Sequence, residues 1–91
     1  MPLASLLSDI DWREHVGKID FTPGQVCAIA GISRVKLDYW VERAGIATRG
    51  NKQRVFDASG VELLLLIKQG RDLGLGLGAS IDAARSAQAR H

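Results

Sequence analysis

Apolar and polar positions alternate at helical spacing in two short segments that meet at a glycine, between residues 22 and 44. The first segment opens with Thr22, Pro23 and Gln25, which is the order of an N-terminal capping box with proline at the first helical position. It predicts a helix that ends at Ala30, with Gly31 as its left-handed stop. Its apolar residues at i, i+3 and i+4 are expected to face the core: Val26, Ile29 and Ala30.

The second segment begins at Ser33, a good N-cap residue, and runs to about Ala44 before Gly45 ends it. At about 100° per residue, the opposite face of this helix centres on Val35 and Tyr39, with charged residues around them. This face is the side available to a partner. The other face is apolar and is expected to be buried: Leu37, Trp40, Val41 and Ala44.

Residues 46–56 read as two short extended pieces around a Gly50-Asn51 turn, which predicts a β-hairpin after the two helices. A hairpin in that position is a wing. The net charge of +2 decides little, but the charge is clustered. Such a cluster is either a solvated loop or a surface for nucleic acid. Basic residues crowd the hairpin and the end of the preceding helix, with Glu42 as the one acid at the edge: Arg43, Arg49, Lys52 and Arg54.

The segment after the hairpin predicts a third helix from Ala58 to about Leu73, with Asp57 or Ser59 as alternative N-caps. It is apolar almost all round and contains more leucine than one core face needs. The glycines at 70, 74, 76 and 78 predict a turn, and an Ala-rich fourth helix is expected over 80–90.

The N-terminal extension, residues 1–20, carries an apolar stripe that predicts a short amphipathic helix: Leu3, Leu6, Leu7 and Ile10. Two uses of this stripe are open. It joins Leu63 or Leu66 of the third helix in a self-association surface, as a homodimer or a side-by-side assembly. Alternatively, it folds back and covers those leucines within one chain.

Composition narrows the function mainly by exclusion. The chain has 91 residues, 46% of them hydrophobic, which suits one small domain. Its single cysteine, Cys27, and its distant histidines, His15 and His91, have no metal-binding spacing. No nucleophile and base can be assembled either, so we expect no catalytic residues, no metal and no cofactor. Neither a secretion signal nor a run close to the roughly 20 residues of a membrane span is present, which predicts a cytoplasmic protein.

The sequence AGISRVKLDYWVERAGI, residues 30–46, resembles the DNA-binding domain of the MerR family of bacterial transcription regulators. The likeness rests on the Gly-Ile-Ser corner, the Tyr39-Trp40 pair, the glycine after the second helix, Arg-Val-Phe at 54–56 and the order Arg71-Asp-Leu-Gly. It extends from Phe21 to about Ala87. The expected fold is therefore mainly α: a winged helix-turn-helix domain at 21–91 with a small two-stranded β-hairpin wing, preceded by an extra N-terminal helix.

The resemblance implies that the helix at 33–43 enters the major groove of double-stranded DNA. It also implies that Tyr39 contacts the DNA backbone and that Arg54 grips a phosphate. The pattern agrees, because Tyr39 is on the outward face and Arg54 is in the basic hairpin. The expected DNA-binding residues are Ser33, Arg34, Val35, Lys36, Tyr39, Arg43, Arg49, Lys52 and Arg54.

Two departures from the family pattern matter. The family often has arginine where this chain has Val35, and a valine there can still touch a thymine methyl group. Family regulators also continue into a long dimer-forming helix and an effector domain, whereas this sequence stops at His91, so it resembles a short form.

The function that these patterns predict is sequence-specific DNA binding by a small bacterial or phage transcription regulator, associated with the nucleoid. A phage excisionase or a small-terminase-like DNA-architecture factor is an alternative. A further alternative is a protein-interaction module on the same scaffold, which Asp38 and Glu42 favour because carboxylates repel phosphates.

Overall fold

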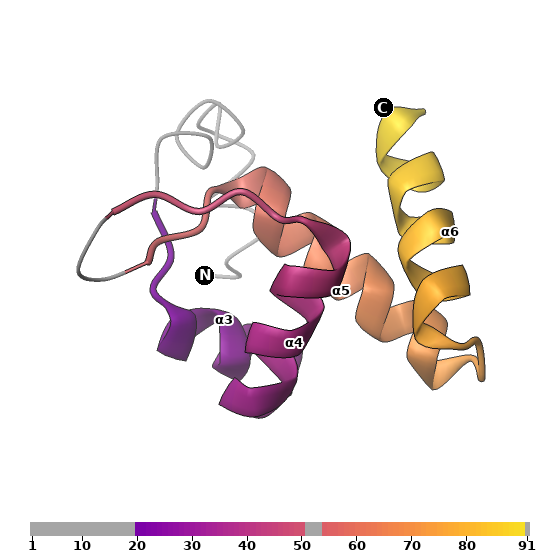
Figure 1. Cartoon of the computed structure of the whole chain (residues 1–91), viewed down its shortest axis with the longest axis horizontal. Helices are drawn as coiled ribbons and strands as arrows, with labels where there is room; N and C mark the ends of the chain where they lie inside the picture. Colours follow the sequence, from indigo (N-terminus) through magenta and orange to yellow (C-terminus); the bar gives the residue numbers. More distant parts are fainter. Residues whose placement is uncertain (1–19, 51–53, 91) are drawn as a thin grey trace, which may run out of the picture.

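The computed structural model describes residues 20–50 and 54–90. Four helices make up most of this part: α3 (Pro23–Ala30), α4 (Arg34–Ala44), α5 (Ala58–Asp72) and α6 (Leu77–Ala89). Helix α5 lies in the middle, with α3 and α4 on one side of it and α6 packed along the other (Figure 1). The mainly α, helix-turn-helix expectation is confirmed. The predicted N-terminal helix with Leu3, Leu6, Leu7 and Ile10 lies outside the described residues, as does Lys52.

Helix α3 begins with the predicted capping box. The Thr22 hydroxyl accepts from the Gln25 backbone N–H at 3.2 Å, and the Gln25 side chain accepts from the Thr22 N–H at 2.8 Å. Gly31 ends the helix in the left-handed region at φ 68°. The predicted inward position of Ile29 is wrong, because its side chain is 48% exposed. Cys27 packs against the core in its place, so the buried stripe of this short helix is turned toward α4 and α5.

Helix α4 agrees with the prediction at both ends and on its buried face. The Ser33 hydroxyl accepts from the Lys36 N–H at 3.1 Å, and Gly45 adopts φ 65° after the last turn. Ile32 fills the corner between α3 and α4. All four predicted core residues are buried: Leu37, Trp40, Val41 and Ala44.

The predicted two-stranded wing is wrong in its regular form, because the described part of the 46–56 segment contains only single bridges. Arg49 and Val55 form one antiparallel bridge, in which each backbone N–H donates to the other carbonyl, at 3.0 and 2.9 Å. Phe56 is buried, and its backbone N–H and C=O both pair with Phe21, at 2.8 Å each. Since Phe56 is held by Phe21, two residues before α3, the pairing with residues 46–49 does not continue into a ladder.

Helix α5 starts where Asp57 caps it, with the carboxylate accepting from the Gly60 N–H at 2.8 Å, and not at the alternative Ser59 cap. Helix α6 begins at Leu77, three residues earlier than the predicted 80–90 helix. Gly76 supplies the extended N-cap, and Leu77 packs against the core. The apolar Leu77 therefore draws the chain into a helix through Gly78, although local propensity favours a turn there.

Most of the leucines of α5 are buried or half-buried in the core. Leu63 is only 6% exposed and Leu66 is half-buried against the core. Three leucines of α5 and the turn after it are exposed: Leu65, Leu73 and Leu75. Helix α5 contains more leucine than one core face needs because one of its faces packs on α3 and another on α6.

Helices α5 and α6 lie close together at Gly70 and Ser80. A Cβ atom added to Gly70 would lie 2.8 Å from the Ser80 Oγ, closer than real Cβ contacts allow. The Ser80 hydroxyl is fully buried and has no hydrogen-bond partner among the described residues. The missing side chain at Gly70 therefore sets how closely the two helices pack.

None of the described helices is long and apolar enough to cross a membrane. Within the same residues, no three histidine, cysteine, aspartate or glutamate side chains gather where they could hold a metal ion.

Candidate nucleic-acid interface

The outward face of α4 is centred on two exposed side chains one turn apart. Val35 is 80% exposed and Tyr39 is 49% exposed. Both belong to the half of the helix that follows the Ser33 cap. Because Leu37, Trp40 and Val41 anchor the opposite face in the core, this outward face is held in a fixed orientation.

Tyr39 is oriented by a cation. The guanidinium carbon of Arg43 lies 5.7 Å from the centre of the Tyr39 ring, and Arg43 Nη1 donates to the Tyr39 hydroxyl at 3.2 Å. This arrangement uses an acceptor position of the hydroxyl and leaves its proton to donate outward. A phenol O–H beside a guanidinium is suited to an anionic oxygen.

The basic side chains at the start of α4 also rest against neighbours on the helix. Arg34 Nε donates to Asp38 Oδ1 at 3.2 Å, an i,i+4 pair in which both side chains are more than half exposed. Lys36 Nζ lies 6.0 Å from the centre of the Trp40 ring. Such exposed contacts are weak, so a phosphate can replace them at small cost.

A groove of about 540 Å³ runs along one side of α4. One wall is the helix itself, with the Arg34 and Asp38 pair, and the other is the 46–56 segment, with Arg54. Glu42 also lines this groove, so its charge is mixed. Its lining residues are Arg34, Asp38, Val41, Glu42, Gly45, Ile46, Thr48 and Arg54.

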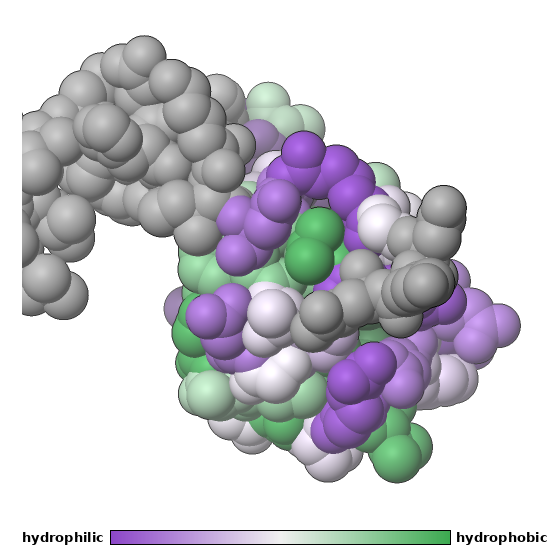
Figure 2. All heavy atoms as spheres, turned by 90° about the vertical axis from the view of Figure 1, so that its left-hand side faces the viewer, coloured by the Kyte–Doolittle hydropathy of each residue, from purple (hydrophilic) through white to green (hydrophobic). Residues whose placement is uncertain are grey.

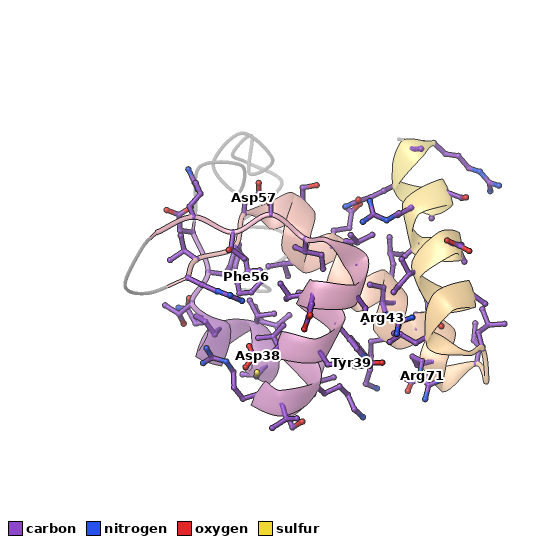
Figure 3. The ribbon with its side chains drawn as sticks, in the orientation of Figure 1. Asp38, Tyr39, Arg43, Phe56, Asp57 and Arg71 are labelled. Carbon is purple, nitrogen blue, oxygen red and sulfur yellow. The ribbon has the colours of Figure 1, made fainter. Side chains whose placement is uncertain are left out.

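A second groove, of about 420 Å³, runs along the other side of α4, toward the corner between α5 and α6. Arg71, in the last turn of α5, forms its far wall, and its Nη1 donates to the Leu75 carbonyl at 2.9 Å. Tyr39, Arg43 and Arg71 lie on this side of α4, and Asp38 lies on the other (Figure 3). The groove is lined by Ser33, Val35, Lys36, Tyr39, Trp40, Arg71 and Leu77.

The structure brings most of the predicted DNA-binding residues together. Five of them lie on the exposed half of α4 or line its flanking grooves: Ser33, Arg34, Val35, Lys36 and Tyr39. Arg43 joins them through Tyr39, and Arg54 through the first groove. Lys52 lies outside the described residues.

Arg49 is placed differently from its predicted neighbours. Its guanidinium forms an ion pair with the carboxylate of Asp20, so it already has a counter-charge. Figure 2 shows hydrophilic and apolar side chains interspersed on one face of the molecule. The basic cluster read from the sequence is therefore partly neutralised.

Arg71 is the residue that the sequence does not single out for binding. It enters only as part of the Arg71-Asp-Leu-Gly order, far from the helix at 33–43. Its place beside Lys36 and Tyr39 depends on the path of α5 through the fold. The one signal in the sequence is a cation in the last turn of a helix that precedes a glycine-rich turn.

Helix α4 is thus an exposed helix between two grooves, each with an arginine on its far wall. The fold and this surface define a helix-turn-helix DNA-binding protein. A sequence profile described as MerR HTH family regulatory protein matches residues 21–86, and the chain belongs to this family. The members of this family are DNA-binding transcription regulators and not enzymes, so the chain is a DNA-binding protein that acts in transcription regulation. No curated protein matches the chain.

Proposed function

We propose that the chain binds specific sequences of double-stranded DNA by laying the first half of α4 in the major groove. Arg54 and Arg71 contact the phosphates that border the groove on its two sides. The observation that carries the proposal is the position of these two arginines, on the far walls of the two grooves that flank α4. An exposed helix with cations on only one side would suit a protein partner as well as it suits DNA.

Affinity in this proposal comes mainly from phosphates. Each neutralised phosphate releases counterions, so the logarithm of the affinity falls by about 0.9 for each tenfold rise in salt concentration. Tyr39 with Arg43, Arg54 and Arg71 supply such contacts from three different parts of the fold. These contacts position the protein but carry little sequence information.

Specificity comes from the first turn of α4, where Arg34, Val35 and Lys36 follow the Ser33 cap. Two cations in the first turn of a helix oppose its macrodipole and cost folding stability. Sequences that oppose local helix preferences with no gain in packing are found mainly at functional sites, so the cations of this first turn support a role in binding. Each good base contact is worth about 1–3 kcal/mol of discrimination.

The biological role that fits is that of a small bacterial or phage transcription regulator acting at the nucleoid. An excisionase-like or small-terminase-like architectural role would use the same surface and differ in bending the duplex. A protein-interaction module is favoured by the carboxylates of Asp38 and Glu42 in the first groove. The Arg34 partner of Asp38 offsets one of these charges, which supports the DNA role.

The experiment is a fluorescence-anisotropy titration of the full chain against a random duplex, followed by selection from a randomised duplex library. The proposal expects binding at low salt that weakens steeply with added salt, and a selected consensus sequence. A protein-interaction module would ignore the duplex. A circular-permutation gel assay on the selected duplex separates the two DNA roles, since an architectural factor retards the permuted fragments unequally.

A further inference from the structure

Val35 is the most exposed of the large apolar side chains among residues 20–50 and 54–90, at 80%. It is the second residue of α4, in the turn that follows the Ser33 cap. Valine is β-branched and stabilises an exposed helix position less than alanine, lysine or glutamate does. Folding therefore gives no reason for a valine at this place.

The polar neighbours of Val35 are each drawn toward another partner. Arg34 is paired with Asp38, and the Lys36 ammonium lies over the Trp40 ring. The Tyr39 hydroxyl accepts from Arg43. The two methyl groups of Val35 thus stand as an apolar point among charged groups, at the edge of the groove that contains Arg71.

In the major groove, an apolar side chain such as Val35 faces base edges that consist mainly of hydrogen-bond donors and acceptors. Placed against the N4 amine of cytosine or the O6 and N7 of guanine, valine would strip water from a polar group and offer no hydrogen bond in return. The apolar group in that groove is the C5-methyl group of thymine. A 5-methylcytosine carries the same group at the same place.

We propose that Val35 is a specificity-determining residue that reads the C5-methyl group of a pyrimidine in the DNA target. The inference rests on the proposed function, since it requires α4 to lie in the major groove. It adds the chemical group that the first turn of α4 recognises. Arg34 and Lys36 then read or position the flanking base pairs.

The test uses the full 91-residue chain and the duplex that it selects from a randomised library. Each thymine of that duplex is replaced in turn by deoxyuracil, which removes the C5-methyl group and keeps the hydrogen-bonding edges. Anisotropy titrations should find one thymine whose replacement weakens binding roughly three- to fivefold, because one buried methyl group is worth about 0.8 kcal/mol. In the V35A variant, the same replacement should change nothing.

Two controls make the comparison specific. V35A should fold, because alanine is the better helix former, and circular dichroism checks this. The matched variant L73A removes a side chain that is 78% exposed but lies outside α4, and it should keep the full loss at deoxyuracil. Replacing the T·A pair by C·G and by 5-methylcytosine·G then shows whether the methyl group is read on either base or on thymine alone.

Two results would overturn the inference and leave DNA binding in place: no thymine is sensitive to deoxyuracil in the parent, or V35A shows the same loss. A parent chain that binds no duplex, or selects no sequence, overturns the proposed function and this inference with it.

Discussion

The guanidinium of Arg43 lies 5.7 Å from the centre of the Tyr39 ring and donates to its hydroxyl at 3.2 Å. If this pair offers the Tyr39 proton to a phosphate, Y39F should weaken binding to all duplexes about equally. The expected loss is roughly two- to twelvefold, since one hydrogen bond is worth about 0.5–1.5 kcal/mol. Anisotropy with the selected and a scrambled duplex measures it. A loss confined to the selected duplex would instead make Tyr39 a base contact.

The two arginines on the groove walls should each contribute one phosphate contact. R54A and R71A are each expected to reduce the slope of log affinity against log salt by about 0.9, without changing the selected sequence. The matched control is R90A at the C-cap of α6, a residue that lines neither groove, and it should leave the slope unchanged. If R71A behaves like R90A, the second groove takes no part in binding.

Arg49 and Asp20 form an ion pair, so if Arg49 contacts DNA as predicted, Asp20 would compete with a phosphate for it. D20N should free Arg49 and tighten binding by up to about fivefold at low salt, since exposed ion pairs are worth about 0.2–1 kcal/mol. D82N makes the same charge change on an exposed residue of α6 and serves as the control. In an R49A background, D20N should have no effect; a gain that persists there would come from general repulsion and not from Arg49.

The contact between α5 and α6 predicts opposite effects of alanine at two glycines. G70A should lower the free energy of unfolding by about 1–3 kcal/mol, because its Cβ would lie 2.8 Å from Ser80 Oγ. G78A is in open space within α6 and should raise the free energy of unfolding by up to about 1 kcal/mol. Urea denaturation of both variants measures the difference, and equal stabilities would mean that the helices are not packed as described.

Self-association through the N-terminal stripe together with Leu63 or Leu66 stays a prediction. Leu63 is in the core and Leu66 is half-buried, so the N-terminal stripe is the part of this surface that a deletion can test. Deletion of residues 1–16 should abolish a dimer seen by light scattering and leave the helices of 20–90 folded. A one-chain mass for the full protein at high concentration, with one-to-one binding on long DNA, would count against it. A large loss of stability on deletion would favour the fold-back alternative.

Local chemistry made much of the fold predictable. Three helices begin at a cap whose side chain accepts from a backbone N–H three residues later: Thr22, Ser33 and Asp57. Gly31 and Gly45 end helices through their own backbone conformation. Signals of this range are contained in the sequence itself. The buried face of α4 followed for a similar reason, since helical periodicity fixes which residues share a face.

The errors fall where partners far apart in the chain decide the outcome. Ile29 is exposed because of the direction in which α3 meets α4 and α5, and Phe56 leaves the hairpin because it pairs with Phe21. The same holds at the interface. Arg71 reaches the side of α4 through the path of α5, and Arg49 is paired with Asp20 across 29 positions. Spacing along the chain carries no information about such neighbours.

The two groove walls are supported in unlike ways. Arg71 belongs to the last turn of α5, and α5 packs on both α3 and α6. Arg54 instead belongs to a segment whose described part is held by two isolated bridges, Arg49–Val55 and Phe21–Phe56. Natural duplexes differ in groove width and stiffness from one sequence to the next. The Arg71 side would act as the fixed reference from which the protein sets its register. Variation in DNA shape would then be accommodated on the Arg54 side, so flanking sequences that narrow or widen the groove there would be tolerated better than the same change beside Arg71.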